Sequence, residues 1–207
     1  MNARVAAVAL LLGACGGAPP RVTLAPPTAA PAAADYVDHL KQFSRHGHVI
    51  ADFDEALTID ATLHAPQFRS AYASKWIDTY RLNAEDAAKK RAQLMAEIAD
   101  VYEVHAETST HFYGINDFTQ GKGIWRVTLI DDQGRAVQPA DARQSLDKRD
   151  VDLAFYPYAG IFSRGWRFRF PRTLPDGSQL VQPDTKWIAL RIAGPQGSTD
   201  LIWELKK

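Results

Sequence analysis

The feature that most constrains the fold of this chain is a repeated alternation of apolar and polar residues. Residues 56–64, 104–113 and 124–131 each alternate in this way, as a strand with one buried and one solvated face requires. Further short strand-like segments lie between Gly- and Pro-containing turns: 151–155, 166–170, 179–181, 187–192 and 200–205. The pattern predicts a mainly β (α+β) fold, an antiparallel, immunoglobulin-like β-sandwich of roughly seven to nine strands.

Residues 66–101 interrupt this pattern with two predicted helices. Pro66 stands at a first helical position, where its missing N–H costs nothing. An apolar stripe follows at helical spacing: Phe68, Tyr72, Trp76 and Tyr80. Asn83 is a suitable N-cap for the second helix, with Asp86 three residues later. The short connection predicts an antiparallel helical hairpin inserted after an early strand.

Residues 35–45 fit two different patterns. Tyr36, Leu40 and Phe43 fall at helical spacing, whereas Leu40, Gln42 and Ser44 alternate with their neighbours as in a strand. The sequence leaves both alternatives open. The next three residues, His46-Gly47-His48, predict a tight turn.

Composition limits the kinds of partner and of stabilisation. The chain carries 24 basic and 24 acidic side chains, so it has no general electrostatic attraction for nucleic acid, and no nucleic-acid partner is predicted. Cys15 is the only cysteine, which excludes an internal disulfide and a site built from several thiolates. Residues 35–207 are long enough to form a single domain around one apolar core.

The N-terminal residues have the layout of a secretory signal. Arg4 precedes an apolar run from Val5 to Leu12, and small residues then lead to Cys15. The run ends at Gly13, well short of the ~20 apolar residues that a membrane-spanning helix needs. An ordinary signal peptide with a cysteine nearby by coincidence is the alternative interpretation.

The sequence Leu12-Gly13-Ala14-Cys15 resembles the lipobox of bacterial lipoproteins. This resemblance covers residues 1–15 only, and the rest of the chain shows no family motif. It implies that residues 1–14 are removed and that Cys15 carries the lipid, palmitate included, which anchors the protein to a membrane of the cell envelope. Gly16 follows where some inner-membrane lipoproteins have Asp, so the resemblance favours the outer membrane, facing the periplasm. Residues 15–34 are rich in Ala and Pro and predict a linker that holds the domain away from the bilayer.

Four arginines occupy outward-facing positions of the predicted strands: Arg126, Arg167, Arg169 and Arg191. Neighbouring strands would place them in one stripe that suits the carboxylates or phosphates of an envelope polymer. A solvated sheet face with acidic neighbours such as Glu204 is the alternative. A group of aromatic residues predicts either a sugar- or peptide-binding surface or packing at the sandwich edge: Tyr156, Tyr158, Phe162 and Trp166.

The histidines are the other candidates for chemistry. His105, Glu107 and His111 share one face of a predicted strand, and His64 lies on another strand. On a strand, residues i and i+6 are ~20 Å apart, so His105 and His111 cannot bind the same ion. A solvated strand face explains these residues, and His46-x-His48 with Asp52 or Asp54 is an equally loose group. No Gly-x-Ser-x-Gly motif occurs, and the sequence predicts no catalytic residue, no metal and no cofactor.

These observations favour a lipid-anchored cell-envelope protein that acts as a non-catalytic binding or structural module. Its predicted partners are the membrane, through Cys15, and an envelope protein or wall polymer. The first alternative is a metal-dependent envelope hydrolase that uses His64, His105 or His111. An accessory protein of a secretion system or pilus is the second.

Overall fold

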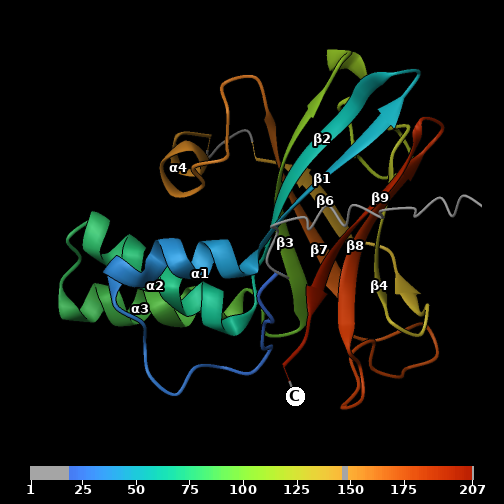
Figure 1. The fold of residues 1–207 in the computed structure, drawn as a ribbon. Coiled ribbons are helices and arrows are strands. Elements are labelled where there is room, and N and C mark those ends of the chain that lie inside the picture. The colour runs from blue at the N-terminus through green and yellow to red at the C-terminus, as the bar shows by residue number, and fades with distance from the viewer. Residues whose placement is uncertain (1–18, 146–148, 207) are drawn as a thin grey trace, which may run out of the picture.

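The computed structural model of the chain describes residues 19–145 and 149–206. The predicted signal peptide, residues 1–14, and Cys15 lie outside the described residues. Five strands form one antiparallel sheet, in the order β1 (Ser44–Ala51), β2 (Asp54–Leu63), β3 (Val101–Thr110), β7 (Arg164–Pro171) and β6 (Asp141–Gln144). The second antiparallel sheet has the order β5 (Ala136–Val137), β4 (Arg126–Asp131), β8 (Trp187–Gly194) and β9 (Gly197–Glu204). The predicted antiparallel β-sandwich is confirmed (Figure 1).

The apolar core lies between the two sheets. Val104 and Ala106 of β3 pair with Phe168 and Trp166 of β7, and all four side chains are buried. The four-stranded sheet contributes residues such as Leu129, Leu190 and Trp203 to the same core. The alternation in the sequence therefore identifies the inward-facing residues correctly.

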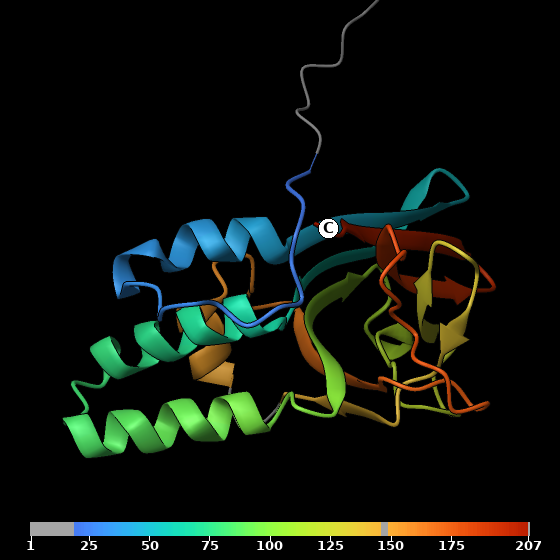
Figure 2. The ribbon, with the colours of Figure 1, turned by 90° about the horizontal axis from the view of Figure 1, so that it is seen from below.

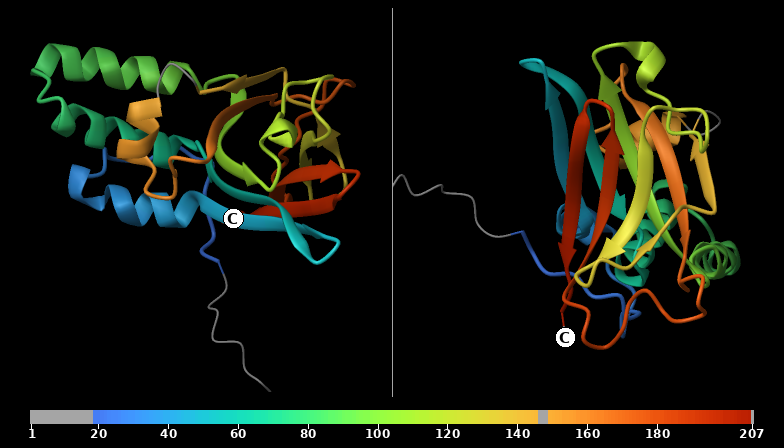
Figure 3. Two further views of the ribbon diagram at one scale, coloured as in Figure 1. Left: turned by 90° about the horizontal axis from the view of Figure 1, so that it is seen from above. Right: turned by 90° about the vertical axis from the view of Figure 1, so that its right-hand side faces the viewer.

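The helices lie on the other face of the five-stranded sheet. They are α1 (Tyr36–Phe43), α2 (Pro66–Thr79), α3 (Ala84–Ala96) and α4 (Arg149–Phe155), with short 3-10 turns at Ala33–Asp35 and Tyr113–Ile115. Figure 2 and the left view in Figure 3 show these helices and the four-stranded sheet on opposite sides of the five-stranded sheet. No helix in the described part of the chain is both long and apolar enough to cross a bilayer.

The predicted helical hairpin is confirmed as α2 and α3. Pro66 begins α2. The side chain of Asn83 caps α3, because its Oδ1 accepts a hydrogen bond of 2.9 Å from the Asp86 amide. The residues that signalled these helix ends in the sequence perform the expected roles.

The predicted turn at His46-Gly47-His48 is wrong, because these residues lie inside β1, directly after helix α1. The glycine is needed for space rather than for a turn. A Cβ atom on Gly47 would lie 2.9 Å from Thr199 Oγ1 and 3.2 Å from Leu201 Cδ1. Glycine thus lets β1 approach β9 where the two sheets meet.

Residues 151–155, predicted as a strand, belong to helix α4 instead. A five-residue apolar run does not distinguish a strand from a short helix by periodicity. Phe155 is buried against the rings of Tyr36, Tyr72 and Trp76. Helix α4 therefore packs against the helical hairpin and not into a sheet.

Part of the predicted linker is packed onto the sandwich. Val22 is fully buried, its amide donates to Glu204 O at 2.8 Å, and its carbonyl accepts from the Lys206 amide at 2.7 Å. The Arg45 guanidinium also donates to Pro20 O at 2.9 Å. Val22 is one of the few large apolar residues of the Ala- and Pro-rich segment, and burying it fixes this part of the chain beside β9.

Candidate functional site

The outer face of the five-stranded sheet is polar yet buried. Glu103, His105 and Glu107 alternate along β3 on this face and are only 1%, 4% and 3% exposed. The prediction of a solvated strand face is wrong for His105 and Glu107, because the helices cover them, whereas His111 is exposed as that prediction requires. We use the term polar cluster for seven buried groups between sheet and helices and one half-buried arginine beside them: His64, Arg69, Glu103, His105, Glu107, Asp152, Tyr156 and Arg169.

Glu103 is the centre of one half of the polar cluster. Its Oε1 accepts a hydrogen bond of 2.9 Å from His64 Nδ1, and its Oε2 accepts one of 2.9 Å from Arg169 Nε. Arg69 Nη1 lies 3.4 Å from Oε1. Burial by itself raises the pKa of Glu103, but these donors and charges outweigh it and hold that pKa well below its usual value.

The two arginines also connect the sheet to the helical hairpin. Arg69 of α2 donates from Nε to Leu94 O at 3.0 Å and pairs with the Glu97 carboxylate. Arg169 of β7 donates from Nη2 to Glu97 O at 2.7 Å. The Glu103 carboxylate therefore holds together strands β3 and β7 and the helices that cover them.

His64 is neutral in this environment. Burial lowers its pKa from 6.5 to about 4 against the opposing effect of Glu103. His64 Nδ1 lies 2.9 Å from Glu103 Oε1, which can only accept, and 2.9 Å from Arg69 Nη1, which can only donate. Nε2 and the Tyr156 hydroxyl are 2.8 Å apart, and burial raises the pKa of Tyr156, so that this hydroxyl keeps its proton.

The other half of the polar cluster consists of His105, Glu107 and Asp152. His105 Nε2 lies 3.3 Å from Glu107 Oε1. One donor atom from each of the three residues lies within 4.8 Å of the others. The Tyr156 ring stacks on the His105 ring, with centroids 3.9 Å apart and planes at 11°. Ser163 Oγ donates to Glu107 Oε2 at 2.5 Å.

These three residues are the only group in residues 19–145 and 149–206 with the spacing and donor types of a metal site. Beside them lies a cavity of about 70 Å³, also bordered by Ser145 and Arg167. Since a water molecule occupies ~30 Å³, this cavity has room for an ion and its waters.

Three other histidines, His46, His48 and His111, lie elsewhere and are exposed. His111 Nδ1 lies 3.0 Å from Asp54 Oδ2, and His46 Nδ1 lies 2.9 Å from Asp60 Oδ1. His48 approaches the His46 ring. The separation of His105 from His111 agrees with the strand geometry, and the loose group of His46, His48, Asp52 and Asp54 does not converge.

The four predicted arginines do not form one stripe, because they lie in two different sheets. Arg126 and Arg191 are on β4 and β8, where Arg191 makes a two-pronged ion pair with Asp200 at 2.8 and 2.6 Å. Arg169 is held by Glu103, and Arg167 borders the small cavity. Alternation along a strand gives the face of each residue but not the sheet to which the strand belongs.

The aromatic group is mainly a packing feature. Tyr156 and Trp166 are buried, and the Tyr158 hydroxyl contacts Thr62 Oγ1 at 2.5 Å. Phe162 alone of the four is strongly exposed.

Sequence reasoning missed Arg69, Glu103 and Asp152. Arg69 carried a usable signal, since it is a charged residue on the buried side of α2, next to Phe68. Glu103 lies two residues before His105 on the same face of β3. Asp152 gave no signal, because its segment was predicted as a strand.

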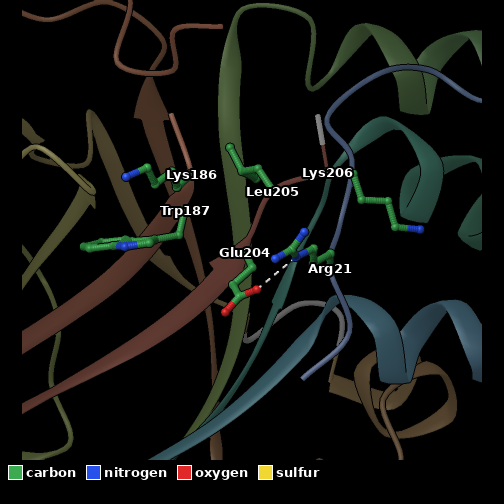
Figure 4. A pocket seen from close by; sticks show the side chains of 6 residues that line it. All are labelled: Arg21, Lys186, Trp187, Glu204, Leu205 and Lys206. Atoms are coloured by element: carbon green, nitrogen blue, oxygen red, sulfur yellow. Dashed lines mark hydrogen bonds and ion pairs between the residues drawn. The ribbon is translucent and has the colours of Figure 1, made fainter. Parts of the chain in front are cut away.

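A larger hollow of about 670 Å³ lies away from the polar cluster. It is lined by Arg21, Lys186, Trp187, Glu204, Leu205 and Lys206 (Figure 4). Arg21 Nε and Glu204 Oε2 form an ion pair of 3.1 Å across it. This hollow marks the place where the N-terminal segment joins β9, and three of its six residues are cationic.

Exposed apolar side chains gather at one end of the five-stranded sheet, which we call the apolar end. They come from the β1–β2 hairpin, the residues after β3 and those before β7: Ile50, Phe53, Phe112, Ile161 and Phe162. Antiparallel pairing brings these three connections to the same end. His111, next to Phe112, contacts Asp54 of the hairpin.

The hairpin turn at the apolar end is strained. Asp52 and Phe53 have φ values of 50° and 65°, a left-handed conformation that turns of this kind usually give to Asn or Gly. Phe53 is also fully exposed. The Phe53 side chain therefore has no packing role in the described part of the chain that would explain a bulky residue at this turn position.

No family model and no curated protein matches the sequence. The fold is similar to a crystal structure from Burkholderia pseudomallei K96243, described as a novel protein of unknown function. The two share 12% sequence identity over 83% of this chain and 82% of that chain, with a TM-score of 0.42.

Proposed function

We propose that this protein is a lipid-anchored cell-envelope protein, held through Cys15 at the outer membrane and facing the periplasm, whose sandwich is a non-catalytic binding module. One observation supports this proposal more than any other. The described segment nearest to Cys15, around Val22, lies at one end of the sandwich, and the apolar end lies at the other.

The opposite placement follows from the pairing of the strands. Val22 pairs with Leu205 at the end of β9, and Trp203 Nε1 donates to Phe43 O just before β1 begins. The apolar end lies beyond the far end of β1, an eight-residue strand, ~25 Å away at ~3.3 Å per residue. Figure 1 shows the C-terminus and the β1–β2 hairpin at opposite ends.

The anchor would keep the domain close to the bilayer. Cys15 precedes the fixed residue Val22 by seven residues, which span at most about 25 Å when fully extended. The cationic side chains of Arg21, Lys186 and Lys206 would then face the headgroups. The apolar end would point away from this membrane and meet a partner in the periplasm.

The charges near the apolar end favour a protein as that partner. Asp52, Asp54 and Glu55 surround Phe53 and are exposed, so they would repel an anionic lipid surface. Exposed apolar patches with polar rims are typical of protein–protein interfaces. The matching partner is an envelope protein that has an apolar pocket with basic residues around it.

The cavity of the polar cluster gives no specific support to an envelope hydrolase. Its volume is only about 70 Å³ beside the His105 and Asp152 side chains. The exposed apolar end, in contrast, offers a surface for a partner, so we favour the non-catalytic module.

Labelling with palmitate tests the anchor. Wild-type protein is expected to incorporate the label and to sediment with membranes, because Cys15 is its only thiol and stable attachment needs more than one acyl chain. Cys15→Ser protein is expected to remain unlabelled and to leave the membrane fraction. Equal labelling of both forms would contradict the proposal.

Cross-linking in the native bacterium tests the binding module. With a photo-crosslinking residue at Phe53 or at Phe162, we expect the same single protein adduct, since both residues lie at the apolar end. The same probe at Arg21 is expected to react with lipid, and at Ile202, which is also exposed on β9, to give neither adduct. Lipid adducts at Phe53, or an adduct with a second copy of this chain, would refute the proposed partner.

A further inference from the structure

We infer that His105, Glu107 and Asp152 form a binding site for a divalent transition-metal ion of the zinc type, which ties helix α4 to strand β3. This site is independent of the anchor and of the apolar end. One imidazole and two carboxylates are a ligand set that zinc accepts.

The distances suit a shared ion. Two ligands that are each about 2.1 Å from a tetrahedral ion lie about 3.4 Å from one another. His105 Nε2 and Glu107 Oε1 are already 3.3 Å apart. The third donor, from Asp152, is within 4.8 Å of both, so a side-chain movement of about 1 Å completes a three-ligand set.

The His105 nitrogen supplies an independent indication of a ligand. The side chain is buried, and its Nε2 has no hydrogen-bond partner among the described residues, although Glu107 is near. Buried polar atoms are nearly always hydrogen-bonded, and an exception calls for an explanation such as an ion. A metal ion between Nε2 and the carboxylates provides it.

Gly165 keeps space open above the two carboxylates. A Cβ atom at this position would lie 2.8 Å from Glu107 Oε1 and 3.0 Å from Asp152 Oδ2. Gly165 lies in β7 opposite Glu107 without the positive φ that favours glycine. Its lack of a side chain therefore serves the close approach of these oxygens, not the backbone.

The surrounding groups orient the ligands as in known metal sites, where neighbours fix the ligand side chains. Tyr156 holds the plane of the His105 ring by stacking, and Ser163 donates to the distal oxygen of Glu107. The cavity of about 70 Å³ beside His105 and Asp152 has room for about two waters that complete the coordination. Because its ligands come from β3 and α4, we assign the ion a structural role.

The test measures zinc in the full-length protein. Protein treated with EDTA, then given zinc chloride and desalted, is expected to retain one zinc per chain and to unfold at a temperature several degrees higher than before. His105→Gln and Asp152→Asn are expected to reduce the bound zinc at least tenfold and to abolish the shift. His111→Gln, the same substitution at an exposed His–Asp pair, is expected to retain both.

Three other results would contradict the proposed metal site. Less than one zinc per ten wild-type chains would overturn it. So would equal zinc loss in His105→Gln and His111→Gln, or an equal thermal shift with magnesium or calcium. If His105→Gln does not fold, as judged by circular dichroism, Asp152→Asn and the EDTA-treated wild type give the same decision.

Discussion

Replacing Glu103 with alanine is expected to lower the free energy of unfolding by about 3–5 kcal/mol, the range seen when one partner of a buried ion pair is removed. Glu103 is 1% exposed and holds His64, Arg69 and Arg169. Without its carboxylate, two guanidinium groups between sheet and helices lose their shared anion. Urea unfolding of the purified protein, followed by circular dichroism, measures the loss.

Glu204→Ala is the matched control. Glu204 also pairs with an arginine, Arg21, but both side chains are largely exposed to solvent. Exposed pairs contribute ~0–1 kcal/mol, so this variant is expected to unfold at nearly the wild-type urea concentration. If both variants lost a similar free energy of unfolding, burial would not be the reason for the contribution of Glu103 to stability.

The β-sandwich and the helical hairpin of α2 and α3 could be predicted from the sequence because both produce a local periodicity of apolar residues. The alternation around Val104 and Trp166 reflects one apolar face, and Pro66 and Asn83 mark helix ends by local chemistry. The turn predicted at Gly47 is wrong because a distant strand, β9, leaves no space for a side chain at this position. Glycine required by a tertiary contact cannot be told from glycine required by a turn within a short window of sequence.

The candidate site was only partly predictable for a related reason. Alternation separates the face of Glu107 and His105 from that of Val104 and Ala106, but a polar face is read as solvated unless something covers it. Here α2, α3 and α4 cover it, and α4 was not recognised. Asp152, the residue that completes the group, reaches it only through that helix.

The stability of the protein is expected to fall as the pH is lowered from 7 to 5, by about 2 kcal/mol through His64 alone. Burial lowers the pKa of His64 from 6.5 to about 4 in the folded state. Between these two values the unfolded chain binds the proton and the folded chain does not. His64 therefore stabilises the fold fully above pH 6.5, and this contribution is lost as the pH falls towards 4.

A pair of variants isolates this contribution from the other titrating groups. His64→Gln keeps a donor for Glu103 but cannot be protonated, so its unfolding free energy is expected to change about 2 kcal/mol less than that of the wild type between pH 7 and pH 5. His46→Gln, the same change at an exposed histidine paired with Asp60, is expected to keep the wild-type dependence. The Glu103 carboxylate does not interfere in this range, because its pKa is held below its usual value and its contribution is lost only at lower pH. Parallel pH profiles for wild type and His64→Gln would mean that His64 binds its proton as readily in the folded protein as in the unfolded chain, and the lowered pKa of His64 would have to be abandoned.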